Sequence, residues 1–195
     1  MNTHRQRRSF TLVEMMAVVA LIGLLVTVSI PAMNGLMNSS NLTSAGQTVA
    51  DQIGLARQTA SARNRAVEIR FIRLSADARG YDAMQLWMTS ANGEAKPLNR
   101  LTSFPTGIVV SDDTTNLSKA LEFADSGVLG SNLYPNAEYV ALQIRPSGLV
   151  TPTLPMSDLY LTVLRARDAE DGNLPSNYLT VQLNPNTGVP LIFRP

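Results

Sequence analysis

The chain has 195 residues, 45% of them hydrophobic, which suits one ordinary domain with an appended segment and is too little for two full cores. Its 16 Lys and Arg against 15 Asp and Glu give a formal charge of +1, without the basic excess of strong nucleic-acid binders. The absence of cysteine excludes disulfides and thiolate metal sites. His4 is the only histidine, so everything after it lacks the most common general base.

Residues 1–9, MNTHRQRRS, are basic and polar, and we interpret them as a leader peptide. Residues 10–30 then form an apolar run in which Glu14 is the only charge. At about 1.5 Å per residue, a helix of that length spans on the order of 30 Å, the thickness of a bilayer's hydrocarbon core. We therefore expect a transmembrane and assembly helix over 10–31, with the basic flank in the cytoplasm and the rest of the chain outside.

Glu14 is the informative residue of this segment, because a carboxylate inside a membrane-spanning run requires a compensating interaction. One interpretation is a capping box, in which Thr11 and Glu14 satisfy the first free N–H groups of the helix. The other is that Glu14 pairs with a positive group supplied by another subunit. The sequence leaves both open.

The stretch RRSFTLVEMMAVVALIGLLV resembles the class III signal of type IV pilins and pseudopilins. The resemblance implies cleavage between Ser9 and Phe10 by a prepilin peptidase, N-methylation of Phe10, and pairing of Glu14 with the N-terminal amine of a neighbouring subunit. Gly23 and Pro31 also match positions typical of that family. Ser9 departs from it, because the residue before the cut is normally Gly.

Two ordinary alternatives for the segment are a cleaved secretory signal and an uncleaved signal anchor. Cleavage by the general signal peptidase needs a site with small residues after the apolar run, and Ile30-Pro31-Ala32 fits that pattern poorly. Pro31 also lacks the N–H that would bond to Thr27, so we expect a kink or local opening over 27–31. Together with Gly23, this would give a softened stretch of helix.

Residues 32–66 are expected to continue the helix outside the membrane. Apolar or small residues recur there every three or four positions and predict one stripe that packs on a sheet, namely Leu42, Ala45, Val49, Ile53, Ala56 and Ala60. A strand signal begins at Val67 with VEIRFIRL, whose alternation places Val67, Ile69 and Phe71 on one face. We expect a β-rich globular head over 67–195.

Short strand candidates with tight turns between them predict an antiparallel sheet in that head. The candidates are Met84–Thr89, Ile108–Val110, Tyr139–Ile144, Leu159–Ala166, Tyr178–Leu183 and Leu191–Phe193. Residues 111–137 are rich in Asp, Asn, Ser and Gly and are interpreted as a long surface excursion with a helical turn at Lys119–Phe123. The expected fold class is α+β, a long N-terminal helix packed on an antiparallel, sandwich-like, pilin-like head.

The segment LTSAGQTVADQIGLARQTASARNRAVEIRF, with the later QIRPSGLV and VQLNPNTGVPLIF, resembles the minor pseudopilin H of type II secretion and FimT-like minor pilins. The Ala56-Arg57 and Arg63-Asn64 pairs carry part of this likeness. The family called Verru_Chthon cassette protein D is similar in length and layout. The resemblance implies a minor structural subunit in the inner membrane, with a periplasmic head, whose partners are the prepilin peptidase and other pseudopilins or pilins.

A DNA-binding minor pilin and a signal-anchored protein of another activity are the alternatives. DNA-uptake members of the family are implied to use an arginine-rich tail, and only Arg194 follows Gly188 here, so nucleic acid is not expected as a partner. No nucleophile and base pair or phosphate-binding loop is found, so we predict no enzyme, no catalytic residue, no cofactor and no metal site. Asp112 and Asp113 read as a solvated turn.

Two further features receive structural interpretations. Arg57, Arg63 and Arg65 are expected to be solvated or paired with Asp51 and Glu68. Trp87, the only tryptophan, is expected to be a core residue on a strand.

Overall fold

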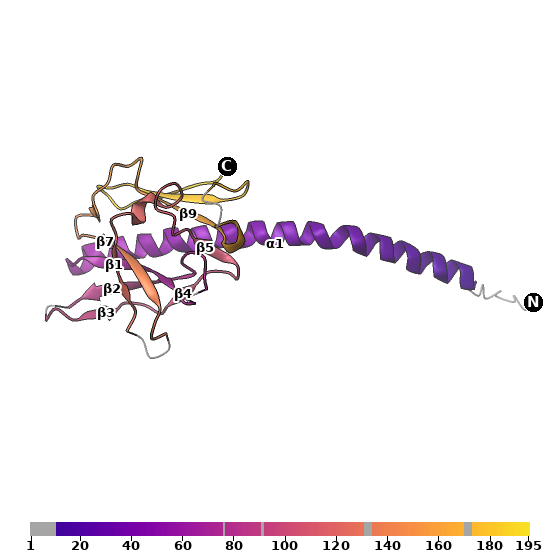
Figure 1. The fold of residues 1–195 in the computed structure, drawn as a ribbon, viewed down its shortest axis with the longest axis horizontal. Coiled ribbons are helices and arrows are strands. Elements are labelled where there is room, and N and C mark those ends of the chain that lie inside the picture. The colour runs from indigo at the N-terminus through magenta and orange to yellow at the C-terminus, as the bar shows by residue number, and fades with distance from the viewer. Residues whose placement is uncertain (1–10, 76, 91, 131–133, 170–172) are drawn as a thin grey trace, which may run out of the picture. The chain divides into compact units, whose positions relative to one another are not determined.

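The computed structural model describes residues 11–75, 77–90, 92–130, 134–169 and 173–195, and the side chains of 28–36 and 38 lie outside that description. The chain divides into two compact units, Met1–Ser39 and Ser40–Pro195. One helix, α1 (Leu12–Arg63), contributes residues to both units. The strands all belong to the second unit (Figure 1).

The end of α1 is set by a backbone conformation that a helix does not continue. Asn64 has φ of 48°, in the left-handed region that asparagine tolerates better than most residues. The Arg65 N–H then donates to the Ala60 carbonyl oxygen at 3.1 Å, which closes the last turn. The chain leaves the helix after Arg63 and enters the first strand at Val67.

Two antiparallel sheets form the head. The larger sheet, hereafter sheet A, has the order β3-β2-β1-β7-β6, with β4 paired to β2 and β8 paired to β7. Its strands are β1 (Val67–Arg73), β2 (Ala83–Thr89), β3 (Ala95–Pro97), β4 (Thr102–Ser103), β6 (Asp125–Val128), β7 (Glu138–Ile144) and β8 (Val150–Thr151). The smaller sheet, sheet B, has the order β11-β10-β9-β5 and contains β5 (Ile108–Val110), β9 (Tyr160–Arg165), β10 (Leu179–Leu183) and β11 (Pro190–Phe193).

The predicted helix stripe is confirmed and lies in the centre of the core. All six of its residues from Leu42 to Ala60 have no exposed surface, and they share one hydrophobic cluster with residues of both sheets. Gly46 lies so close to β10 that a Cβ there would stand 2.5 Å from Leu179 Cδ2. The helix therefore packs between side chains of sheet A and sheet B, and glycine allows its close approach to sheet B.

The two sheets are joined at both sides by backbone hydrogen bonds. Tyr81, two residues before β2, and Val110 of β5 exchange N–H···O bonds of 2.8 and 2.9 Å. The Val150 N–H donates to the Pro185 carbonyl oxygen at 2.9 Å, linking β8 to the turn after β10. These bonds satisfy backbone groups that would otherwise be left unpaired where each sheet ends.

The prediction that residues 111–137 form a surface excursion is wrong in part. The short 3₁₀ helix η1 (Lys119–Leu121) confirms the helical turn predicted at Lys119–Phe123. The segment also contains the strand β6, however, and several of its residues are buried. The Asp113 carboxylate accepts the N–H groups of Thr115 and Asn116, and the Ser118 hydroxyl oxygen accepts the Thr162 N–H of β9 at 3.1 Å. Polar side chains that suggest a loop in the sequence here hold the segment against sheet B. A second 3₁₀ helix, η2 (Ala166–Asp168), follows β9.

Candidate processing and assembly segment

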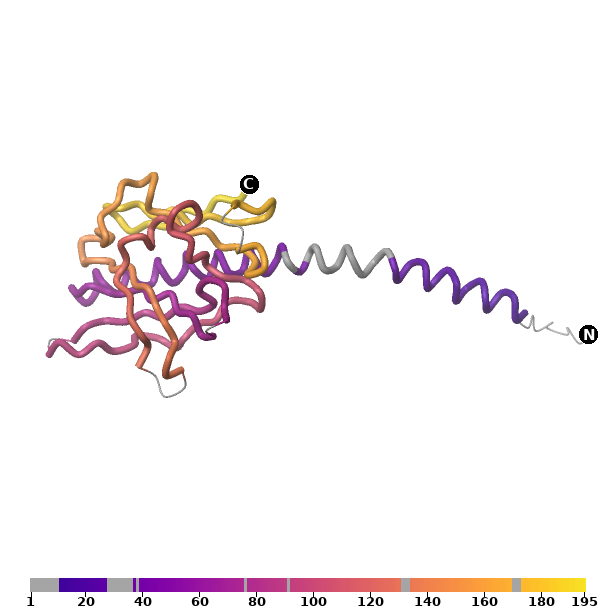
Figure 2. The backbone as a smooth tube through the Cα atoms, in the orientation of Figure 1, coloured from indigo at the N-terminus to yellow at the C-terminus, as the bar shows by residue number. Residues whose placement is uncertain are grey.

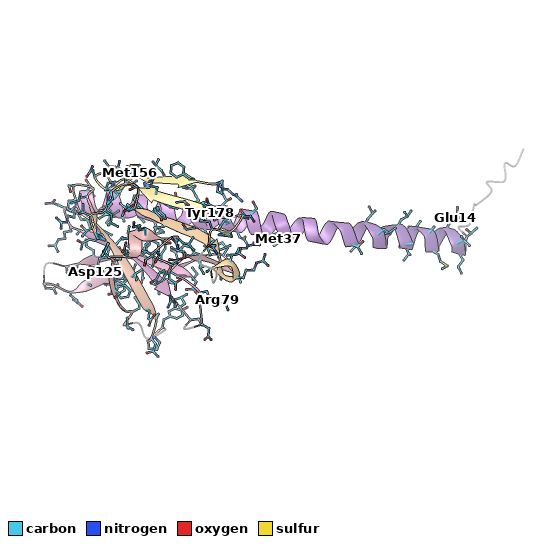
Figure 3. All side chains as sticks on the ribbon, turned by 45° about the horizontal axis from the view of Figure 1, so that its top comes forward. Glu14, Met37, Arg79, Asp125, Met156 and Tyr178 are labelled. Carbon is cyan, nitrogen blue, oxygen red and sulfur yellow. The ribbon has the colours of Figure 1, made fainter. Side chains whose placement is uncertain are left out.

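The predicted cleavage and methylation residues, Ser9 and Phe10, lie outside the described residues. The description begins at Thr11, immediately before α1. Glu14 lies in the first turn of that helix (Figure 3).

A capping box forms at the start of α1. The Thr11 N–H and the Thr11 hydroxyl each donate to Glu14 Oε2 at 3.0 Å, and the Glu14 N–H donates to Thr11 Oγ1 at 3.2 Å. The Met15 N–H donates to the Thr11 carbonyl oxygen at 3.2 Å, which makes Thr11 the N-cap. The first of the two interpretations of Glu14 is therefore present in the folded chain. It uses only one oxygen of the carboxylate.

Large apolar side chains are exposed along the first turns of α1. They are between 46% and 77% exposed and comprise Leu12, Val13, Met15, Met16, Val18, Val19, Leu21, Ile22, Leu24, Leu25 and Val26. At 100° per residue these positions point in all directions around the helix axis. A helix that is apolar all round is usually covered by protein or by lipid.

Gly23 and Pro31 are the other two predicted site residues. Gly23 lies within α1, and an added Cβ there would meet no atom within 4 Å. Pro31 also falls inside the bounds of α1, but its side chain is outside the described ones, so the kink predicted over 27–31 stays a prediction. Within the described residues, no helix meets the length and hydropathy of a membrane span.

Of the two predictions for the helix-end arginines, solvation is confirmed for Arg63, which is exposed, whereas pairing with Glu68 is wrong. Glu68 is held by Arg70, whose Nη2 and Nε donate to Glu68 Oε2 at 2.7 and 3.0 Å. Arg65 instead donates to the Thr89 carbonyl oxygen at 3.2 Å. Arg57 Nε is buried and has no hydrogen-bond partner within the described part of the chain. Residues 68 and 70 lie on one face of β1, because side chains of a strand repeat every second residue, and that proximity decides the pairing.

Arg70 also organises an aromatic cluster that the sequence analysis missed. Its guanidinium carbon lies 4.1 Å from the ring centroid of Trp87 on β2 and 4.2 Å from that of Tyr139 on β7. Trp87 lies on a strand, as predicted, but it is half-buried and stacks on Arg70 outside the main core. Cation–π stacking of this kind stabilises the outer face of sheet A. The only sequence signal is the alternation of β1, which directs Arg70 to that face.

A second arginine links the two sheets. Arg73 of β1 pairs with Asp112, which follows β5, and its Nη1 lies 3.3 Å from Glu138 Oε2 of β7. Its guanidinium carbon lies 5.4 Å from the Tyr81 ring centroid. Burial of Tyr81 raises the pKa of its phenol above the ordinary value, against the opposing effect of Arg73.

Among the described residues, no group of three or more His, Cys, Asp or Glu side chains is placed to hold a metal ion. Asp112 is paired as described above, and Asp113 caps a turn. Arg194 donates to Thr43 Oγ1 at 2.7 Å and to Asn177 Oδ1 at 3.1 Å. Its head group is thus engaged with the helix and with the loop before β10.

Comparison with known proteins identifies the N-terminal segment. Residues 4–30 match the family profile described as the prokaryotic N-terminal methylation motif. This confirms the prepilin-like signal and includes four of the five predicted site residues, Ser9, Phe10, Glu14 and Gly23, with Pro31 directly after it. No curated protein sequence matches the chain.

Solved structures resemble the fold more distantly. The minor pseudopilin EpsH from the type 2 secretion system of Vibrio cholerae is 14% identical, with 80% of this chain and 96% of that chain covered, at a TM-score of 0.45. The type IV minor pilin FimU of Pseudomonas aeruginosa is 14% identical, with 80% of this chain and 89% of that chain covered, at a TM-score of 0.43.

Proposed function

We propose that this type IV prepilin-like chain is a minor pilin or pseudopilin, a structural subunit of a type II secretion or type IV pilus-like assembly. The observation that carries the proposal is the methylation motif over residues 4–30. The exposed apolar side chains of Leu12 to Val26 support it, because an isolated molecule gains nothing from showing them to water. Assembly, not catalysis, is the activity that these features serve.

Processing by a prepilin peptidase would cut between Ser9 and Phe10 and leave Phe10 as a methylated N-terminus. The segment 10–31 would then lie in the inner membrane, with the cytoplasmic side at its N-terminus and the head in the periplasm. This topology is supported by the basic residues before Phe10 and by the apolar composition of 10–30. Other pilins or pseudopilins would cover the parts of the helix that lipid does not.

The capping box and an inter-subunit ion pair can coexist at Glu14. The cap uses Glu14 Oε2, and in the described part of the chain Oε1 has no hydrogen-bond partner. The Thr11 amide that donates to Glu14 belongs to the second residue of the processed chain, so cleavage leaves it in place. A charged amine from a neighbouring subunit could therefore approach Oε1 while the cap holds the carboxylate in one orientation.

Mass spectrometry of the N-terminus tests the processing step. The full-length chain is co-expressed with a prepilin peptidase, purified from membranes and digested. We expect a methylated peptide beginning at Phe10. A mature start near Met33 would instead indicate an ordinary secretory signal, and retention of the arginines before Phe10 would indicate a signal anchor.

Three substitutions separate the two roles of Glu14. Glu14→Gln keeps a capping side chain but removes the charge, Glu14→Ala removes both, and Thr11→Val removes the hydroxyl cap but keeps the charge. We expect all three to be processed, and we expect both Glu14 variants to be recovered in assemblies about tenfold less than Thr11→Val, because the charge makes the contact between subunits. Normal incorporation of Glu14→Gln would show that the cap alone matters.

A further inference from the structure

The last strand of sheet B presents an edge unlike the other sheet edges. β11 consists of Pro190, Leu191, Ile192 and Phe193, pairs with β10 on one side, and lies at the end of its sheet. It belongs to the yellow C-terminal segment in Figure 2. Its last three side chains are 42%, 40% and 52% exposed. Three consecutive exposed apolar residues on an edge strand form a template for pairing with another chain.

The other free edges of the described sheets carry the features that discourage such pairing. β3 contains Lys96, which is paired with Glu94, and ends at Pro97. β6 begins at the exposed Asp125. β5 is covered on its outer side by its bridge to Tyr81. β11 alone among these edge strands combines exposed apolar side chains with no charge, since the three apolar residues of β5 are buried.

The hydrogen bonds of the neighbouring strands show which backbone groups β11 leaves free. The Asn184 N–H donates to the Val189 carbonyl oxygen, on the side of β11. The Leu183 N–H points away from β11 and donates to the carbonyl oxygen of Leu159, just before β9. Bonding alternates along an antiparallel pair, so Leu191 and Phe193 face β10 with their backbone groups. The N–H and C=O of Ile192 then point away from the sheet.

The end of the strand is held in place before any partner arrives. Arg194 follows Phe193 directly and donates to Thr43 of α1 and to Asn177 before β10. The edge is therefore ordered and lies beside the first turns of the helix that belong to the head. Order of this kind reduces the entropy lost when a second strand pairs.

We propose that β11 is a docking edge for an extended segment in the head of a different pilin-type subunit, not of a second copy of this chain. The partner is expected to supply unpaired backbone groups opposite Ile192 and apolar side chains beside Leu191 and Phe193, so that it extends sheet B by one strand. The inference rests on the proposed function, because assembly through the N-terminal helix would hold the heads of neighbouring subunits at high effective concentration.

Site-specific photo-crosslinking in the source organism tests the proposal with the full-length chain. The photoreactive amino acid p-benzoylphenylalanine replaces Phe193, Lys96 on the β3 edge as the head control, or Val19 on α1 as the assembly control. Cross-linked products are identified by mass spectrometry. We expect position 193 to capture a different processed prepilin-type subunit at least about fivefold more often than position 96.

Two substitutions at one position identify the backbone contact. Ile192→Pro removes the outward N–H without touching the ladder to β10, whereas Ile192→Thr keeps both the N–H and the branched side chain. We expect Ile192→Pro to lower capture by about fivefold and Ile192→Thr by less than about twofold. If Ile192→Pro fails to accumulate, Leu191→Lys, which keeps every backbone donor and adds an edge charge, must lower capture instead.

The controls separate this inference from the function on which it rests. Capture from position 19 without capture from position 193 leaves assembly standing and overturns the docking edge. Loss of capture at both positions overturns both. Cross-links of position 193 to lipid only, or to a second copy only, overturn the choice of partner, as does full capture by Ile192→Pro.

Discussion

The contact between α1 and sheet B yields a prediction in which one substitution has two opposing effects. Gly46 and Gly54 both lie within α1, where replacing glycine by alanine gains about 0.5–1 kcal/mol from helix propensity. At Gly54 an added Cβ meets nothing within 4 Å. At Gly46 it would lie 2.5 Å from Leu179 Cδ2 and 2.6 Å from Cδ1. Only the second site must therefore also accommodate a clash.

The magnitudes decide the sign at each site. Overpacking a core costs typically about 1–3 kcal/mol. Gly54→Ala should therefore stabilise the head by about 0.5–1 kcal/mol, and Gly46→Ala should be neutral or destabilising by up to about 2 kcal/mol. The gain in helix propensity is common to both variants, so they differ by the overpacking cost of about 1–3 kcal/mol. For a chain of this size about 1 kcal/mol corresponds to about 2–4 °C in Tm, so the Tm values of the two variants should differ by roughly 2–12 °C.

Thermal unfolding of the full-length chain in detergent, followed by the fluorescence of Trp87, measures that difference. Trp87 is the only tryptophan and lies on β2, so it reports on the head. Leu179→Val shortens the side chain that the new methyl group meets, and it should cost less in the Gly46→Ala background than alone, by at least about 0.5 kcal/mol. Equal stabilisation by Gly46→Ala and Gly54→Ala would refute the close packing of the helix on β10.

Three further predictions concern the head. Arg73→Ala leaves the carboxylates of Asp112 and Glu138 near each other without their shared cation, whereas Lys96→Ala breaks only an exposed ion pair. In urea unfolding, Arg73→Ala should therefore destabilise the head by about 1 kcal/mol more than Lys96→Ala. High salt should reduce this difference in stability, because it screens the charges. Gly188 has φ of 65°, and a Cβ there would lie 3.0 Å from the Gly148 carbonyl oxygen, whereas Gly93 has φ of 82° and a Cβ there would meet no atom within 4 Å. Chemical denaturation should therefore show that Gly188→Ala costs about 1 kcal/mol more stability than Gly93→Ala. Because burial raises the pKa of Tyr81 in the folded state, the unfolded chain ionises this phenol first, and the stability that it contributes should be lost as the pH rises above about 10. Tyr81→Phe should weaken that loss in Tm scans between neutral and alkaline pH.

The parts of the fold that the sequence predicted are those governed by a regular period. The stripe from Leu42 to Ala60 repeats every three or four residues, and all of it is buried. Val67, Ile69 and Phe71 alternate along β1 and have no exposed surface. Both patterns arise because one face of a helix or strand is buried, and the residues of that face recur at short, fixed intervals in the sequence. The sequence alone therefore shows them.

What the sequence could not predict depends on partners that are distant in the chain. β6, with the sequence DSGV, has no apolar alternation, and its strand conformation comes from pairing with β7. The stacking of Arg70 between Trp87 and Tyr139 requires β2 and β7 to flank β1, which only the topology fixes. The pairing of Glu68 with Arg70 was within reach, because a two-residue spacing on a strand brings side chains to one face.

The candidate site divides in the same way. The spacing of Thr11 and Glu14 predicted the capping box, since both groups lie within one helical turn. The charge that Glu14 carries into an apolar segment is not explained by the cap alone, because a neutral glutamine would satisfy the same N–H group. The ion pair with another subunit stays a prediction, and the glutamine substitution is the change that separates it from the cap.

The surfaces that remain uncovered in the second unit follow a pattern of their own. Most of the head needs no partner to bury its apolar surface or to pair its backbone groups. Three features account for this: the buried helix stripe, the hydrogen bonds of Tyr81 and Val150 to the other sheet, and the charges on β3 and β6. β11 carries no charge and, within the described part of the chain, leaves its outer edge unpaired, although a single lysine or aspartate would discourage another strand from pairing there. Such a strand does not stabilise a monomer. In a subunit that recognises its neighbour, by contrast, assembly would pair the free backbone groups of this edge and bury its apolar side chains.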